Sequence, residues 1–243
     1  MSAVIKDMAA AHDVHWSCPV LGLLRSKDGW TVQSPKAVSE HFDAAVLAVP
    51  AEQAAPLLSL HDFGLARCAA MARSQPCWTG MFVFDQPLND VPIIIRDRQH
   101  IAWAARNGAK PGRTGSETLV VQASAAWSQV HLERDQAEIA AKLWSIFSEV
   151  TSCGGVTPHL STAHRWRFAL SAGIGDGALW NAILGLGVCG DWLLGPRVEC
   201  AWLSGRELAG RISNHSGIDL RSQPESLRSY PVAARSARQT SIA

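Results

Sequence analysis

The feature that most constrains the fold is the nearly continuous apolar run Phe42–Val49, which Pro50 closes. A strand with one face in water alternates polar and apolar residues, whereas an unbroken run suits a strand buried on both faces, as in a parallel sheet under helices. Pro50 ends the strand, and the pattern of residues 51–58 favours a helix directly after it. The run therefore predicts an α/β protein with at least one parallel strand.

The middle of the chain has a different pattern of apolar and turn residues. Turn residues at 89–90, 107–108 and 111–112 separate short apolar stretches, a pattern that predicts an antiparallel meander. Helices are expected on either side of these strands, and residues 157–170 are expected to be extended. The predicted strands are 77–84, 92–96, 100–106 and 118–123, and the predicted helices are 62–72 and 135–150.

The two ends of the chain complete the predicted organisation. Before the apolar run we expect a helix at 3–11 and strands at 14–16, 20–25 and 30–33; after the Gly-rich stretch 173–177 we expect a strand at 187–190 and a helix from 199–201 to 212. This order predicts an α/β fold (α+β overall), with one nucleotide-binding, Rossmann-like domain from both chain ends, residues 1–60 and 171–213. An antiparallel substrate-binding domain, 61–170, would be inserted between them, and the Ser- and Arg-rich residues 214–243 are expected to be disordered.

Composition excludes several functional classes. A net charge of +1 gives no electrostatic footprint for nucleic acid or an anionic membrane. The sequence lacks a signal peptide and a run of about 18 apolar residues, so we expect no membrane span and a cytoplasmic location. The six Cys form no CxxC pair, no metal-ligand spacing is present, and no catalytic triad can be assigned. A small-molecule substrate is the expected partner, and the oligomeric state is open.

The residues that carry most chemical information are those from Gly190 to Gly205. Here we expect a strand to deliver Asp191 to a loop, followed by a helix that starts near Glu199 with small residues on its leading face. Unpaired N–H groups at a helix start carry partial positive charge, which stabilises a negative charge nearby by ~0.3–1 kcal/mol. This arrangement favours a planar, electron-accepting ligand that carries phosphate.

Residues 187–205 resemble the C-terminal flavin motif of the flavin amine oxidase superfamily, particularly its renalase-like NAD/FAD-dependent oxidoreductases. Residues 1–33, 42–58 and 164–170 are also similar to segments of that family. The resemblance implies FAD, with Val20 near the adenine, Asp191 and Trp192 near the ribityl-pyrophosphate region, and Val198, Glu199 and Ala201 beside the ring. Arg165 and Trp166 would line the ring or the substrate cavity. Cys200 stands where the family often has Gly.

The sequence departs from that family at its phosphate loop. The family begins with a strand, GxGxxG and a helix, which bind the ADP pyrophosphate. The string GLGVCG at 185–190 does not suit this role, because it overlaps the predicted strand instead of opening a helix. We therefore expect that the nucleotide-binding segment of the family is missing before Met1.

The main functional hypothesis is an FAD-dependent oxidoreductase that passes a hydride from an amine, or from a reduced nicotinamide-like substrate, to flavin N5, with reoxidation by oxygen. A truncated, catalytically inactive fragment or pseudo-enzyme of the same family is the alternative. A binding module for a planar molecule is a third hypothesis, based on ten Trp against one Tyr. Trp166 and Trp192 fit either a ligand platform or an ordinary core, and the catalytic residues are unknown.

Overall fold

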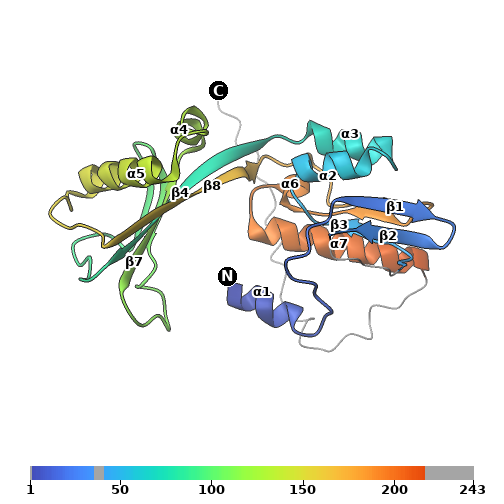
Figure 1. Cartoon of the computed structure of the whole chain (residues 1–243), viewed down its shortest axis with the longest axis horizontal. Helices are drawn as coiled ribbons and strands as arrows, with labels where there is room; N and C mark the ends of the chain where they lie inside the picture. Colours follow the sequence, from blue (N-terminus) through green and yellow to red (C-terminus); the bar gives the residue numbers. More distant parts are fainter. Residues whose placement is uncertain (1, 36–40, 217–243) are drawn as a thin grey trace, which may run out of the picture.

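The computed structural model describes residues 2–35 and 41–216, which form two lobes joined by two long strands (Figure 1). The larger sheet has five antiparallel strands in the order β5-β6-β7-β4-β8. The bounds are β4 (Ser74–Phe84), β5 (Ile94–Arg98), β6 (Ile101–Arg106), β7 (Glu117–Ala123) and β8 (Leu160–Ser171).

The predicted antiparallel pairing is confirmed, but the predicted strand order is wrong for β4. Strands β5, β6 and β7 form a meander, whereas β4 lies between β7 and β8 instead of beside β5. With 11 and 12 residues, β4 and β8 are the two longest strands. Their mutual pairing satisfies backbone groups of both strands, with an irregularity in register between Gln75 and Cys77.

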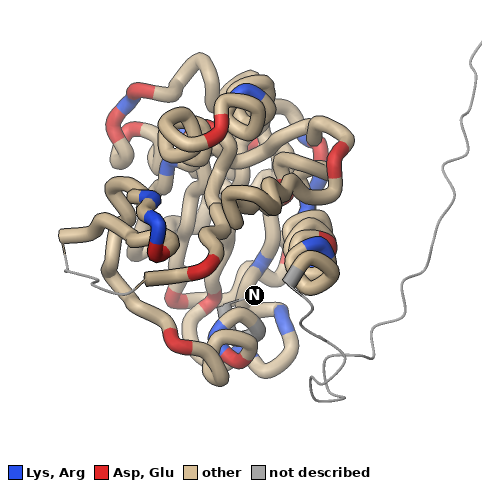
Figure 2. The backbone as a smooth tube through the Cα atoms, turned by 90° about the vertical axis from the view of Figure 1, so that its right-hand side faces the viewer, with Lys and Arg blue, Asp and Glu red and all other residues tan. Residues whose placement is uncertain are grey.

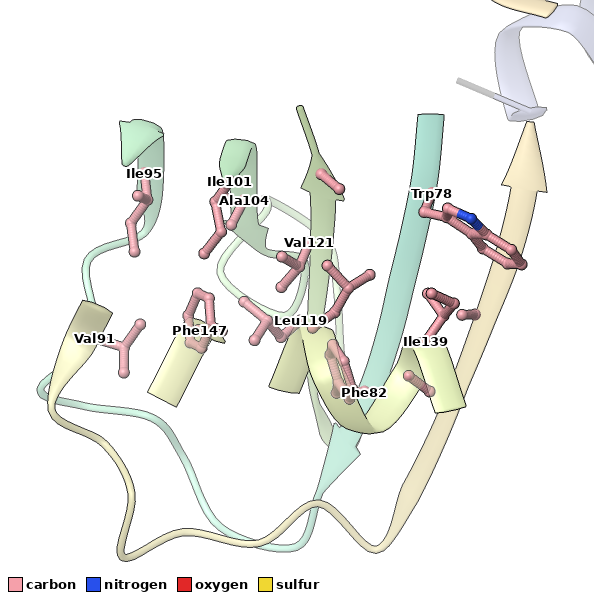
Figure 3. Packing of buried hydrophobic residues seen from close by; sticks show 14 of the residues in the cluster. Trp78, Phe82, Val91, Ile95, Ile101, Ala104, Leu119, Val121, Ile139 and Phe147 are labelled. Atoms are coloured by element: carbon pink, nitrogen blue, oxygen red, sulfur yellow. The ribbon is translucent and has the colours of Figure 1, made fainter. Parts of the chain in front are cut away.

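One face of this sheet is covered by helices α4 (Ala125–Val130) and α5 (Gln136–Thr151). Figure 3 shows side chains from the strands, among them Trp78 and Phe82, directed toward Ile139 and Phe147 of α5. The predicted start of α5 is confirmed, because the carboxylate of Asp135 accepts hydrogen bonds from the next helical N–H groups. The main core of the molecule lies between the sheet and α5.

The smaller sheet has the order β3-β10-β9, with β3 (Ala45–Leu47) parallel to β10 (Leu186–Val188) and β9 (Leu179–Asn181) antiparallel to it. The predicted parallel pairing is thus confirmed. The prediction that residues 42–49 are buried on both faces is wrong, because Val46 is 44% exposed. Within the described residues β3 is an edge strand, so its apolar run does not report burial on both sides.

Helices cover both faces of the smaller sheet. Leu186 and Val188 pack with α2 (Ala51–Leu58) and α3 (Phe63–Met71), whereas Gly187 between them faces Leu208 of α7 (Val198–Ser216). Figure 1 shows this layering, with α2 and α3 on one side and α7 on the other. Because α3 packs in the same core as α2, the expected boundary at residue 60 falls inside one packed unit.

The N-terminal region contributes α1 (Ser2–Ala9) and the hairpin of β1 (Gly22–Ser26) and β2 (Gly29–Gln33). Trp30 anchors the hairpin, since it is fully buried and its indole Nε1–H donates to the carbonyl of Leu184. The strand predicted at 14–16 is wrong, because these residues are irregular. At the other end α7 continues to Ser216, past the predicted end at Ile212, and residues 217–243 of the predicted disordered tail lie outside the described residues.

The mixed α/β fold class is therefore confirmed. In the part of the chain that the structure describes, acidic and basic residues are interspersed and do not gather into a region of one sign (Figure 2). No helix within the described ranges is both long and apolar enough to span a membrane.

Candidate functional site

The candidate site begins at the corner between α6 (Asp191–Leu194) and α7. Asp191 was expected in a loop, but it is the first residue of α6, a single helical turn that directly follows β10 and Gly190. A short turn at 195–197 then reverses the chain into Val198, the first residue of α7. The expected order of strand, Asp191 and helix start is present, with an extra helical turn.

Several hydrogen bonds fix this corner. The backbone N–H of Gly190 donates to Oγ of the fully buried Ser204, which ties the start of α6 to α7 (2.9 Å). The N–H groups of Ile174 and Gly175 donate to the carbonyl of Leu193, at 3.2 and 3.0 Å. Since residues 174 and 175 follow β8 closely, these bonds hold the end of β8 against α6.

The predicted cofactor residues differ in how accessible they are. Val198 is 53% exposed, and Glu199 and Ala201 are also exposed, so the first turn of α7 is open to a ligand. The side chain of Trp192, by contrast, is buried in the core, and its Nε1–H donates to the carbonyl of Val49. With only 1% of the whole residue exposed, Trp192 is a core residue. Val20 lies far along the chain, in the extended segment before β1, and is half exposed.

The second part of the site is the face of the five-stranded sheet opposite α5, which we call the open face. It carries Trp166, Phe168 and Leu170 of β8, which are 53%, 40% and 40% exposed. His164 lies on the same face and meets Trp166 edge to face, with 4.4 Å between ring centroids. Because the end of β8 is held against α6, this apolar row leads toward the α6–α7 corner.

The prediction that Arg165 and Trp166 line the same cavity is wrong for Arg165. Adjacent residues of a strand point to opposite faces. The guanidinium of Arg165 lies on the α5 side, where it donates to the Leu132 carbonyl and to Glu133 and lies over the ring of Trp78. Arg167 binds the same carboxylate, and this hydrogen bond, followed by the charges of both arginines, holds the pKa of Glu133 below its ordinary value.

The register of β4 and β8 adds open-face residues that the sequence analysis missed. Trp166 lies opposite Cys77, His164 opposite Thr79, and Thr162 opposite Met81. Burial raises the pKa of the Cys77 thiol, with a smaller opposing effect from Thr79, so this thiol stays protonated at neutral pH. These residues had no signal of their own in the sequence, because their place on the open face depends on strand pairing.

The open face of the four strands β8, β4, β7 and β6 carries no carboxylate. Their only acidic residue is Glu117, which lies opposite the buried Phe84 and therefore on the covered face. There it forms an ion pair with Arg106 at 2.6 Å. The open face of these strands thus carries no Asp, Glu, Lys or Arg side chain.

The residues present fit the ring end of a flavin. The first turn of α7 offers unpaired backbone N–H groups, and the side chains at 198 and 201 are small enough for a flat ring to approach them. The string 185–190 does not fit the phosphate end. Gly187 lies inside β10, and a side chain there would meet Trp180 and Leu208 at 3.0 Å.

Comparison with known families supports the same conclusion. A model of the family described as flavin containing amine oxidoreductase matches residues 1–213. The chain belongs to this family. As a member of the flavin amine oxidoreductases, it has FAD as the cofactor that the family implies, and the ring-end fit described above agrees with that cofactor.

Several solved structures share the fold of this chain. Cyclohexylamine oxidase from Brevibacterium oxydans IH-35A is 12% identical, with a TM-score of 0.62 over 82% of this chain and 48% of its own. An oxidoreductase from Methanosarcina mazei is 16% identical, with a TM-score of 0.60 over 86% of this chain and 52% of its own. A triple mutant of putrescine oxidase is 12% identical, with a TM-score of 0.60, and covers 87% of this chain and 52% of its own. The chain spans about half the length of the structures it matches.

Proposed function

We propose that this protein is an FAD-dependent amine oxidase whose flavin ring lies at the first turn of α7, beside the open face of the five-stranded sheet. The observation that carries the proposal is the continuity between these two accessible parts. The bonds from residues 174 and 175 to Leu193 hold the end of β8, and with it the apolar row, against α6. The exposed first turn of α7 follows α6 directly.

In this proposal each part of the chain has a distinct task. The backbone N–H groups at Val198 and Glu199 stabilise negative charge on the ring, and Asp191 holds the ribityl chain through its carboxylate. Val20, which is half exposed, contacts the adenine end of the cofactor. The apolar row of β8 binds the carbon skeleton of the substrate and keeps water away from the reacting carbon.

A bound FAD would supply the electron sink for the two-electron oxidation of an amine to an imine, with oxygen as the final acceptor of both electrons. The protein supplies position and electrostatics for this step. We assign no side chain as its acid or base. Cys77, which is protonated and buried, is not a nucleophile in this scheme.

The finer predictions from the sequence enter here as parts of the proposal. A cofactor-binding unit comprises residues 1–72 and 171–213, with the boundary moved from 60 to 72 because α3 packs with α2. Residues 73–170 form the substrate-binding unit. A renalase-like activity on a reduced nicotinamide is the second candidate, but the open face of β8, β4, β7 and β6 offers no Lys or Arg side chain to a nucleotide phosphate.

The test is anaerobic reduction of the FAD-reconstituted protein by benzylamine, followed through the loss of oxidised-flavin absorbance. We expect reduction by the amine and recovery of the absorbance when air is admitted. A protein that binds FAD but is reduced by no amine would support the inactive, pseudo-enzyme alternative. Reduction by NADH and not by amines would support the renalase-like candidate.

A further inference from the structure

We propose that the open face selects a substrate class: monoamines with an uncharged apolar skeleton, to the exclusion of diamines and polyamines. The proposal rests on the proposed function, because it assigns a substrate to the same site. It is carried by the composition of the sheet face along which the substrate would extend away from the α6–α7 corner.

The apolar character of this face comes from both long strands. Trp166, Phe168 and Leu170 of β8 are exposed, and Met81 of β4 is 36% exposed. Exposed aromatic and branched side chains in one row are favourable contacts for alkyl and aryl groups, since each methylene removed from water strengthens binding by about four-fold. A bulky hydrocarbon skeleton therefore gains affinity along the whole row.

A second ammonium group finds no carboxylate partner on the same row. Carboxylates are the groups that pair with a desolvated ammonium, and the only carboxylate of the four strands, Glu117, is on the other face and already paired with Arg106. The second charge of a diamine would be placed against Trp166 and Met81, partly stripped of water and without a counter-charge. Leaving such a charge unpaired is expected to lower affinity by about ten-fold.

The experiment compares hexylamine with hexamethylenediamine, which has the same carbon chain and one more ammonium group. Anaerobic flavin reduction is measured with the FAD-reconstituted full chain, and equilibrium dialysis measures binding of the same two amines without turnover. We expect hexylamine to be favoured by about ten-fold or more in both measurements.

A matched pair of variants tests the cause of the selectivity. His164→Glu places a carboxylate on the open face and is expected to raise the relative preference for the diamine by about ten-fold. Ser161→Glu adds the same charge to an exposed position of β8 on the opposite face and is expected to leave the ratio unchanged. An equal effect of the two variants would show that charge alone, and not its place on the open face, sets the ratio.

The possible failures are distinguishable. If dialysis shows the expected preference for hexylamine but no amine reduces the flavin, the proposed oxidase function is wrong and the selectivity of the face stands. If amines reduce the flavin but both amines react and bind equally well, the oxidase function stands and the selectivity is overturned. If neither amine binds, the inference is overturned as well.

Discussion

The two faces of the five-stranded sheet are both rich in large apolar side chains, yet only one of them is a core. On the covered face Phe82 of β4 and Phe147 of α5 are almost completely buried between the sheet and the helix, whereas on the open face Trp166 and Phe168 are 53% and 40% exposed. Apolar surface costs free energy when it is exposed to water. A row of apolar side chains that stays exposed on one face of a sheet therefore indicates a binding surface. The difference separates residues that stabilise the fold from residues available to a ligand.

The largest expected effect on stability distinguishes Phe147 of α5, which packs on the covered face, from Phe168 of the open face. Phe147→Ala removes a side chain that is fully buried and leaves a cavity under α5, so we expect a loss of about 3–5 kcal/mol of unfolding free energy. Phe168→Ala should cost about 1 kcal/mol or less, because that ring is already partly in water. Urea denaturation of both variants measures the contrast.

The same two variants should differ in the opposite sense when flavin reduction is measured. In the FAD-reconstituted protein we expect Phe168→Ala to slow flavin reduction by an apolar amine by about ten-fold, through lost contact with the substrate skeleton. If Phe168→Ala instead destabilised the fold as much as Phe147→Ala, the open face would be part of the core and the comparison would fail.

A smaller effect is expected from hydroxyl groups on the two faces. Ser128 is fully buried, and its Oγ accepts a hydrogen bond from the backbone N–H of Trp78 (3.0 Å). Ser128→Ala would leave that N–H buried without a partner, at a cost of about 1–3 kcal/mol in unfolding free energy.

Thr162→Ala is the matched control, since Thr162 is exposed on the open face opposite Met81. The hydroxyl group of Thr162 is exposed to water, so its removal is expected to change the unfolding free energy by no more than about 0.5 kcal/mol. Comparable losses in the two variants would show that both faces are equally shielded from water.

The smallest expected effect concerns the ion pairs that hold the α4–α5 connection to β8. The hydrogen bond from Arg167, followed by the charges of both arginines, lowers the pKa of Glu133 below its ordinary value of 4.5. A carboxylate with a lowered pKa in the folded state stabilises the fold above its unfolded pKa and loses that contribution as the pH falls through the folded pKa.

Glu133→Gln should therefore lower Tm slightly at neutral pH, and the difference from wild type should vanish in acid. Salt should reduce the neutral-pH difference, because the cluster is exposed. A difference that grows on acidification would show that the pKa is raised and not lowered.

Much of the fold could be predicted from local patterns. The capping Asp135 and the apolar stripe of α5, the turns between the middle strands and the parallel character of β3 are all local features, and the structure confirms them. The place of β4 between β7 and β8 could not be predicted, since it depends on pairing between residues that are far apart in the sequence.

The candidate site shows the same limit. The motif from 190 to 205 could be recognised because its residues are adjacent in the chain, although the helical turn at Asp191 was missed. The role of Trp192 was ambiguous, since tryptophan is common in cores and in ligand sites. Its hydrogen bond to the Val49 carbonyl shows that it belongs to the core. The face of Arg165 depended on the register of β8, which the sequence does not reveal.

The most direct test of the central claim is an equilibrium titration with FAD of wild type, Ala201→Phe and Asn214→Phe. Ala201 is exposed on the first turn of α7, and Asn214 is exposed on its last turn, so neither change should unfold the protein. If the flavin ring lies at that first turn, Ala201→Phe should weaken FAD binding by about ten-fold or more, whereas Asn214→Phe should bind as wild type does. Equal FAD affinity for all three proteins would contradict the placement of the flavin.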